Sequence, residues 1–93
     1  MPSKKSLADE LKKLRAHINK LDESIICTVA DRMAVSRAVG EIKKRNALPI
    51  KDPAREKDLK KFHQKLADKY DITYQTLRKI FTLIMKESRR IQK

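Results

Sequence analysis

The first half of the chain carries one apolar stripe at helical spacing, and no strong helix breaker interrupts it. Apolar residues recur at steps of three and four positions, at Leu7, Leu11, Leu14, Ile18, Leu21, Ile25 and Val29. This spacing places them on one face of an α-helix. Between Leu7 and Leu48 there is no proline, and the only glycine is Gly40. The pattern therefore predicts one helix from about residue 7 to about residue 45, with Ser6 as its N-cap.

One copy of the chain is too small to cover a helix of that length. At 1.5 Å per residue the helix spans roughly 60 Å, whereas a compact chain of this size has a radius of gyration of about 13 Å. One solution is a break near Gly40. We expect the other solution, a homodimer in which two copies pack their long helices against each other.

The second half predicts two shorter helices. In the loop NALPIKDP, Asp52 is a typical N-cap and Pro53 a typical first helical residue. The helix that follows is expected to end near Lys69 and to bury Leu59, Phe62, Leu66 and Tyr70. After a turn capped by Asp71 or Thr73, a third helix is expected over residues 74–91, burying Leu77, Ile80, Phe81, Ile84 and Met85. The first five residues are expected to be loose. The fold class is all-α, in one domain over residues 1–93.

Composition narrows the function. Charged residues make up 39% of the chain, the formal net charge is +12 and the pI is near 10.1, so an anionic partner is expected: nucleic acid, an acidic membrane or a small anion. No run of 18 apolar residues and no signal-peptide pattern occurs. The single cysteine, Cys27, suits a reducing interior and is expected to be a small core residue. His17 and His63 lack partners at metal-ligand spacing. These features predict a soluble cytoplasmic protein without a metal or cofactor.

Polar side chains occupy positions where the helical stripes call for apolar ones. Arg32 follows Val29 on the first stripe, and Lys43 lies 11 residues further, about 20° away around the helix. Arg15 lies at the edge of the stripe. The third helix turns from apolar to polar on one face, at Ser88 and Gln92. Buried cations need partners, because an unpaired one costs several kcal/mol.

Taken singly, each of these residues has an ordinary explanation. Arg32 is then a salt-bridged or snorkelling side chain, and Lys43 belongs to the solvated run KKR. Ser88 and Gln92 belong to a frayed helix end. Arg55 lies in the first turn of its helix, where the helix dipole disfavours a cation, but it is able to pair with Asp52 three residues earlier.

Taken together, four segments resemble the all-helical class of chorismate mutases. They are LKKLRAHINKLDESI with its R-x-x-I-x-x-L-D core, ADRMAVSRAVGEIKK with R…V-G-x-x-K, PIKDPAREK with D-x-x-R-E, and IFTLIMKESRRIQ with F-x-x-I-x-x-x-S-x-x-x-Q. Their order and separations carry the resemblance over nearly the whole chain. It implies three helices per chain in an intertwined homodimer with two active sites. It also implies the rearrangement of chorismate to prephenate in phenylalanine and tyrosine biosynthesis.

The resemblance also implies roles for ten residues. Arg15, crossing from the other chain, and Arg32 bind the two carboxylates of chorismate. Lys43 and Gln92 donate hydrogen bonds to its ether oxygen. The substrate-binding residues are Asp52, Arg55, Glu56, Ser88, Val39 and Met85: Glu56, helped by Asp52, accepts from the ring hydroxyl, Ser88 contacts a carboxylate, and Val39 and Met85 form apolar walls. An anionic ligand, together with Asp52 and Glu56, would surround Arg55 with negative charge. This would explain why a cation is tolerated in the first turn of that helix. The chain ends one residue after Gln92, so we expect this last turn to fray without ligand.

Three other functions remain. An isochorismate-pyruvate lyase shares the fold, but such enzymes lack the D-x-x-R-E motif and carry a bulkier residue in place of Ser88. A basic helical module that binds nucleic acid explains the charge, but it favours exposed cations with aromatic side chains among them, and only 4% of this chain is aromatic. The third is an inactive or regulatory protein with the mutase fold.

Overall fold

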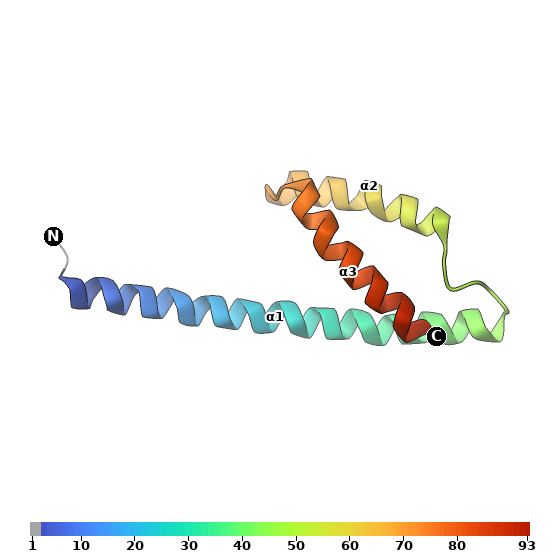
Figure 1. Ribbon diagram of the computed structural model, residues 1–93, viewed down its shortest axis with the longest axis horizontal. Helices are drawn as coiled ribbons and strands as arrows, with labels where there is room; N and C mark the ends of the chain where they lie inside the picture. The colour runs from blue at the N-terminus through green and yellow to red at the C-terminus, as the bar shows by residue number, and fades with distance from the viewer. Residues whose placement is uncertain (1–2) are drawn as a thin grey trace. The chain divides into compact units, whose positions relative to one another are not determined.

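A computed structural model describes residues 3–93 and has three α-helices and no strand among them (Figure 1). They are α1 (Lys4–Arg45), α2 (Pro53–Tyr70) and α3 (Tyr74–Gln92). The chain separates into two compact units, the first ending at Asp31 and the second spanning Arg32–Lys93. The expected all-α class with one long and two shorter helices is confirmed. Each unit is described separately below.

Helix α1 is continuous over 42 residues and passes Gly40 without a break. The alternative of a helix broken at that glycine is therefore wrong. The helix starts three residues earlier than expected, because the cap is Ser3: its side-chain hydroxyl accepts a hydrogen bond from the backbone N–H of Ser6 at 3.1 Å. Ser6 itself is inside the helix. Of the five residues expected to be loose, Lys4 and Lys5 are helical, and Met1 and Pro2 lie outside the described residues.

The apolar stripe of the first unit is exposed. Between 45% and 60% of the surface is accessible at Leu7, Leu11, Leu14, Ile18, Leu21 and Ile25. Cys27 is exposed as well, so the expectation of a core cysteine is wrong for this chain taken alone. Residues 3–31 of this unit hold no second helix that could cover the apolar face.

The caps of the shorter helices follow from local sequence. Asp52 has extended backbone angles, φ −129° and ψ 91°, and its side chain accepts from the backbone N–H of Arg55 at 3.1 Å. Pro53 opens α2, as predicted. Asp71 ends this helix in the left-handed conformation at φ 53°, with its N–H bonded to the carbonyl of Ala67. Thr73 is the N-cap residue of α3, although its side chain forms no capping hydrogen bond.

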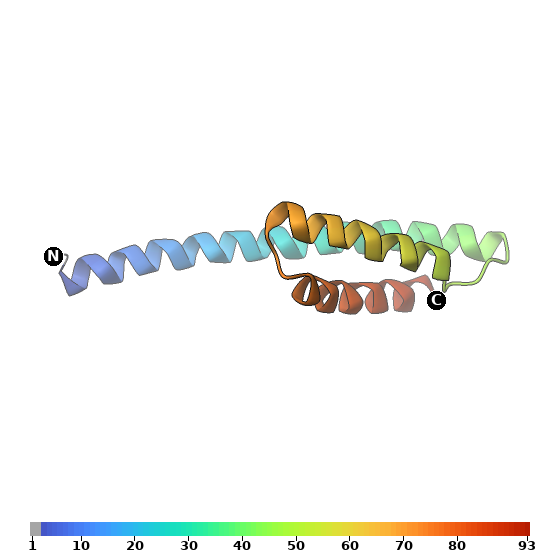
Figure 2. The ribbon, with the colours of Figure 1, turned by 90° about the horizontal axis from the view of Figure 1, so that it is seen from above.

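The core of the second unit is small and lies where α2 and α3 pack together and α3 crosses to the last part of α1 (Figures 1 and 2). Its buried apolar side chains are Met33, Leu59, Ala67, Leu77 and Met85. The expected core positions of α3 are only partly correct, because Phe81 and Ile84 are half-buried and Ile80 is exposed.

The buried face of α2 differs from the expected one. Leu59, His63 and Ala67 are buried, whereas Phe62 and Tyr70 are more than half exposed. The buried residues are four positions apart, and such a row forms a ridge along a helix surface. This ridge faces α3, where the His63 ring lies 4.1 Å from the Phe81 ring, centroid to centroid. Leu59 is therefore correctly predicted and Leu66 is half-buried, but beyond Leu59 the buried stripe shifts by one residue, to His63 and Ala67.

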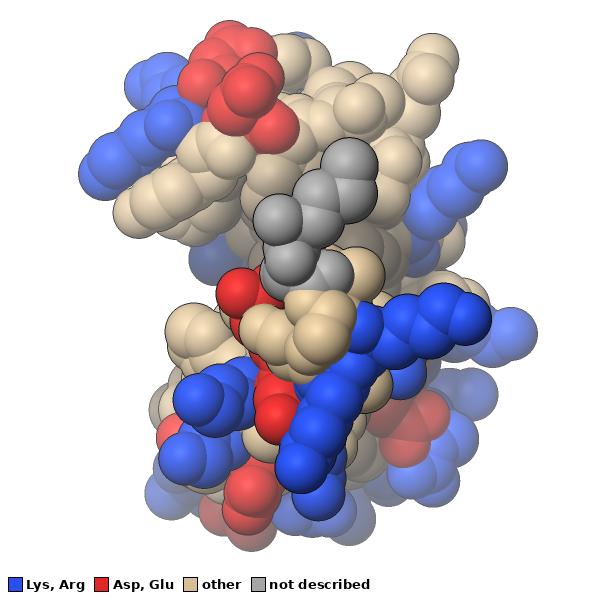
Figure 3. All heavy atoms as spheres, turned by 90° about the vertical axis from the view of Figure 1, so that its left-hand side faces the viewer, with Lys and Arg blue, Asp and Glu red and all other residues tan. Residues whose placement is uncertain are grey.

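The surface is basic but mixed. Figure 3 shows lysine and arginine side chains spread over the face in view, with acidic and uncharged residues among them. In residues 3–93, no helix is both long enough and apolar enough to cross a membrane.

Candidate active site

A cavity of about 290 Å³ opens in the second unit among its three helical segments and the loop before α2. This volume is just below the roughly 300–1,000 Å³ usual for small-molecule sites. Nine of the ten residues expected from the motifs line it: Arg32, Val39, Lys43, Asp52, Arg55, Glu56, Met85, Ser88 and Gln92. The tenth, Arg15, belongs to the first unit and is exposed there.

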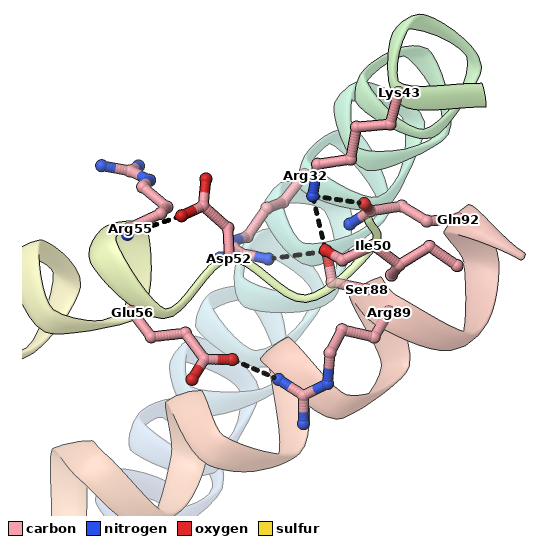
Figure 4. A network of polar contacts seen from close by, with 9 residues as sticks. All are labelled: Arg32, Lys43, Ile50, Asp52, Arg55, Glu56, Ser88, Arg89 and Gln92. Atoms are coloured by element: carbon pink, nitrogen blue, oxygen red, sulfur yellow. Dashed lines mark hydrogen bonds and ion pairs between the residues drawn. The ribbon is translucent and has the colours of Figure 1, made fainter. Parts of the chain in front are cut away.

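Lys43 projects from α1 and contacts only uncharged oxygens. Its Nζ donates to the backbone carbonyl of Ile50 at 2.6 Å and to Oε1 of Gln92 at 3.1 Å (Figure 4). The side chain is half-buried, and among residues 3–93 no carboxylate pairs with it. The ammonium group is thus fixed in direction by two neutral acceptors, with its charge left uncompensated.

Arg32 is in the same situation, eleven residues earlier on α1. Its Nη1 donates to Oγ of Ser88 at 3.3 Å. Burial lowers the pKa of the Arg32 guanidinium from its usual value, and the nearby charge of Arg55 lowers it further. Both effects disfavour the charged form, and within the described chain no acidic group is paired with it to oppose them. An anion at this position would offset both effects, because an opposite charge favours the charged form.

Ser88 is held from the other side by Ser36. Both hydroxyls are buried and hydrogen-bonded to each other, so Arg32, Ser88 and Ser36 form one polar chain between α1 and α3. Every buried side-chain nitrogen and oxygen of the described residues has a partner. Ser88 is therefore fixed without any ligand.

The start of α2 contributes two carboxylates. Asp52 is occupied as the cap of the helix. Glu56 lies in the first turn, and its Oε1 accepts from Nη1 of Arg89 on α3 at 3.2 Å (Figure 4). The side chain of Arg55 forms no ion pair with a described residue, so the simple pairing with Asp52 is not observed. What Asp52 binds is the backbone N–H of Arg55.

Gln92 is the last residue of α3 and is still helical. The frayed final turn expected from the sequence is therefore not what the structure shows. Its carbonyl oxygen accepts from Lys43, which leaves the amide N–H groups of the side chain as donors. The last turn approaches α1 closely, since a Cβ placed on Gly40 would lie 2.9 Å from the Cα of Gln92.

Three contributors were missed from the sequence. Ser36 has a detectable signal, because it lies one helical turn after Arg32 on the same face of α1. The sequence signal for Arg89 is weak. It follows Ser88 directly, but adjacent helical residues point about 100° apart, so the position of Ser88 does not by itself place Arg89 at the cavity. Ile50 has no sequence signal, because it contributes a backbone carbonyl that any residue carries.

The charges around the cavity favour a small anion. Arg32, Lys43, Arg55 and Arg89 are balanced by only two carboxylates, Asp52 and Glu56, which leaves a formal excess of two positive charges. In residues 3–93 no three histidine, cysteine, aspartate or glutamate side chains are grouped to hold a metal ion. Val39 and Met85 add apolar wall. The arrangement is able to hold a dianion with an apolar body.

Comparison with known families decides the assignment. Residues 14–93 match the family described as chorismate mutase type II. The chain belongs to this family. The resemblance drawn from the four motifs is thereby confirmed, and the activity is that of a chorismate mutase, an isomerase.

Relatives of the chain include single and bifunctional chorismate mutases. The chorismate mutase of Methanocaldococcus jannaschii is 29% identical over 87 residues, which cover 94% of this chain and 88% of that protein. A bifunctional chorismate mutase/prephenate dehydratase of Aquifex aeolicus is 39% identical over 55% of this chain and 14% of its own length. The protein of the same description from Buchnera aphidicola is 33% identical over this whole chain and 23% of its own length. The chain thus spans most of the Methanocaldococcus jannaschii relative and less than a quarter of these two bifunctional ones.

Proposed function

We propose that the cavity of the second unit rearranges chorismate to prephenate, a step of phenylalanine and tyrosine biosynthesis, within a homodimer in the cytoplasm. One observation carries this proposal. Arg32 and Lys43 are half-buried cations that contact only neutral oxygens of the described residues. Buried cations are usually paired, which supports an anion from outside the chain as the missing partner.

Chorismate supplies that anion, with two carboxylates. A guanidinium binds a carboxylate through two parallel N–H groups, which suits Arg32, already directed by Ser88. A second carboxylate needs a second guanidinium, and Arg15 of a second copy is the proposed donor. Together they would hold the flexible substrate in its compact reactive conformer, which removes much of the entropy cost of the step.

Lys43 and Gln92 are proposed to act on the ether oxygen. The reaction is a single pericyclic step, in which negative charge grows on this oxygen as the C–O bond breaks. Lys43 Nζ is held by the Ile50 carbonyl, and Gln92 directs its carbonyl to Lys43, so both have donors left for the substrate. Losing one preorganised donor of this kind typically lowers kcat about 10²–10³-fold.

The remaining residues are proposed to position the substrate ring. Glu56 has one oxygen bound to Arg89 and the other able to accept from the ring hydroxyl, with Asp52 adjacent at the loop–helix junction. Val39 and Met85 line the cavity with apolar surface against the ring. Ser88 contacts a carboxylate, and Arg55 gains a negative neighbour when the ligand binds.

A homodimer is supported by the exposed apolar stripe on the first part of α1. Burying apolar surface yields about 25 cal/mol per Å², and six large side chains on one helical face are unusual for a surface left in water. Arg15 lies beside this stripe, next to Leu14. Packing two such stripes together would bring Arg15 of each copy near the partner and allow it to complete the partner's site.

The test is the loss of chorismate absorbance, with prephenate identified as product. Lys43→Ala is measured beside Lys44→Ala, which removes an adjacent exposed lysine that does not line the cavity. We expect turnover by the parent, a fall of about 10²–10³-fold in kcat for Lys43→Ala, and parent-like turnover for Lys44→Ala. Absence of turnover by a folded, dimeric parent would contradict the proposal, and release of pyruvate from isochorismate in its place would favour the lyase.

A further inference from the structure

Arg89 is the one cation of the cavity to which the motifs assign no role. It is half-buried, with 37% of its side chain exposed, and it pairs with Glu56, whose side chain is 32% exposed. Of the two ion pairs among residues 3–93, this is the one that lines the cavity; the other joins Arg90 to Glu87 on the surface of α3. The pair links residues 33 positions apart in sequence, so it crosses from α3 to the first turn of α2 (Figure 4).

The contact with Arg89 restrains the Glu56 side chain but leaves one of its two carboxylate oxygens available. Only one bond is formed, from Nη1 of Arg89 to Oε1 of Glu56, and Oε2 has no hydrogen-bond partner among the described residues. A glutamate side chain has several rotatable bonds, and fixing them carries an entropy cost. The hydrogen bond from Arg89 restricts the Glu56 side chain before a ligand arrives, so the orientation of Oε2 is already restricted.

We propose that Arg89 is a positioning residue that orients the Glu56 carboxylate to accept a hydrogen bond from the hydroxyl of the substrate ring. The inference rests on the proposed function, since it deepens the role of a residue of that site. In this account Arg89 does not touch the substrate. It acts through Glu56, and its removal lowers catalysis by leaving that carboxylate free to adopt unproductive rotamers.

A purely structural tie between α2 and α3 explains the contact less well. Ion pairs with about a third of each side chain exposed contribute little to stability, because water screens them. The Arg90–Glu87 pair is a matched example, from the same helix and with the same types of residue, but it lies within one helix and outside the cavity. It therefore serves as the control for any effect of losing an arginine from α3.

The experiment is a double-mutant cycle on kcat and KM for chorismate. Its members are the parent, Arg89→Ala, Glu56→Gln and the double variant, with Arg89→Lys and Arg90→Ala alongside. We expect Arg89→Ala to lower kcat about 10–100-fold with little change in KM, as for a catalytic group displaced by a fraction of an ångström. The double variant should match Glu56→Gln alone. Arg89→Lys should recover part of the loss, and Arg90→Ala should match the parent.

Three results would overturn the inference. They are an Arg89→Ala variant as active as Arg90→Ala, a double variant whose loss is the product of the two single losses, and a loss confined to KM, which would show that the catalytic step does not depend on Arg89. If Arg89→Ala fails to fold, Arg89→Met keeps the aliphatic stem and takes its place in the cycle. A parent without turnover would refute the proposed function and this inference together. An active parent with an unaffected Arg89→Ala refutes the inference alone.

Discussion

Gly40 has no side chain, which allows the last turn of α3 to lie close to α1 at Gln92. A Cβ at this position would lie 2.9 Å from Cα and 3.0 Å from Cβ of Gln92, closer than such carbons normally approach. Because one of these contacts is with backbone, a change of rotamer does not relieve it. The last turn of α3 would have to move, and Gln92 would move with it.

We therefore predict that Gly40→Ala separates stability from activity. Alanine is favoured over glycine within a helix by about 1 kcal/mol, while the steric clash costs about 1–3 kcal/mol, so the free energy of unfolding should fall by about 2 kcal/mol at most. Displacing Gln92 from Lys43 should lower kcat about 10–100-fold. Urea unfolding and steady-state kinetics on the same preparation test this, and parent-like kcat would show that Gln92 does not need its observed position.

His63 is a buried base between α2 and α3. It is only 2% exposed, and its Nδ1 accepts from Nη1 of Arg78 at 2.9 Å, which places the ring proton on Nε2. Burial lowers the pKa of His63 below its ordinary value of 6.5, and the charges of Arg78, Arg32 and Arg55 lower it further. Burial and these neighbouring charges therefore favour the neutral form of His63 in the folded chain.

The pH dependence of stability follows from that shift. An unfolded chain binds a proton at His63 near pH 6.5, whereas the folded chain resists protonation until lower pH. Stability should thus be complete above the ordinary pKa and fall as pH drops below it, by up to about 1.4 kcal/mol per pH unit, levelling off below the folded pKa. Urea unfolding at pH 7.5 and 5.0 tests this against His63→Gln. An equal loss in both proteins would contradict it.

At the scale of elements, the exposed stripe of α1 makes its own prediction. Ile18→Asp places a charge in the middle of the stripe, whereas Lys20→Asp places the same residue about 200° around the helix. If two stripes pack together, Ile18→Asp should sediment as a monomer and lose turnover, because a buried unpaired carboxylate costs several kcal/mol. Lys20→Asp should remain a dimer. Sedimentation of both variants at matched concentrations decides the point, and a dimeric, active Ile18→Asp would exclude this interface.

The helices themselves were largely predictable because their limits are local. Asp52 and Pro53 predict the start of α2 because they are typical N-cap and first-turn residues. The long apolar stripe predicts the continuity of α1. The buried side of α2 was not predictable in the same way. Phe62 is the more apolar residue, yet His63 is buried, because the ridge that faces α3 is chosen by packing between helices and not by the residue itself.

The candidate site was also only partly predictable from the sequence. Residues fixed by motif spacing, such as Arg32 and Lys43, were found from sequence. Arg89 and Ile50 were not, because the partner of Arg89 lies 33 residues away in the sequence and Ile50 contributes only its backbone carbonyl. The preformed contact between Lys43 and Gln92 also needed the structure, since the sequence alone predicted a frayed end.

At the scale of the whole molecule, the account requires two copies for one complete site. The cavity supplies Lys43 and Arg32, and the exposed first part of α1 carries Arg15. A formal charge of +12 would oppose association, so the apolar stripes must supply the attraction. The assembly and the chemistry are therefore tested best in a single experiment.

That measurement is complementation between two inactive variants, Arg15→Ala and Lys43→Ala, mixed in equal amounts and allowed to exchange subunits. In a mixed dimer, one site receives Arg15 from one chain and Lys43 from the other and is complete. Random pairing makes half of the dimers mixed, each with one complete site of two, so the account predicts chorismate turnover at about a quarter of the parent's. Mixed dimers that form but remain inactive, or an Arg15→Ala variant as active as the parent, would contradict it.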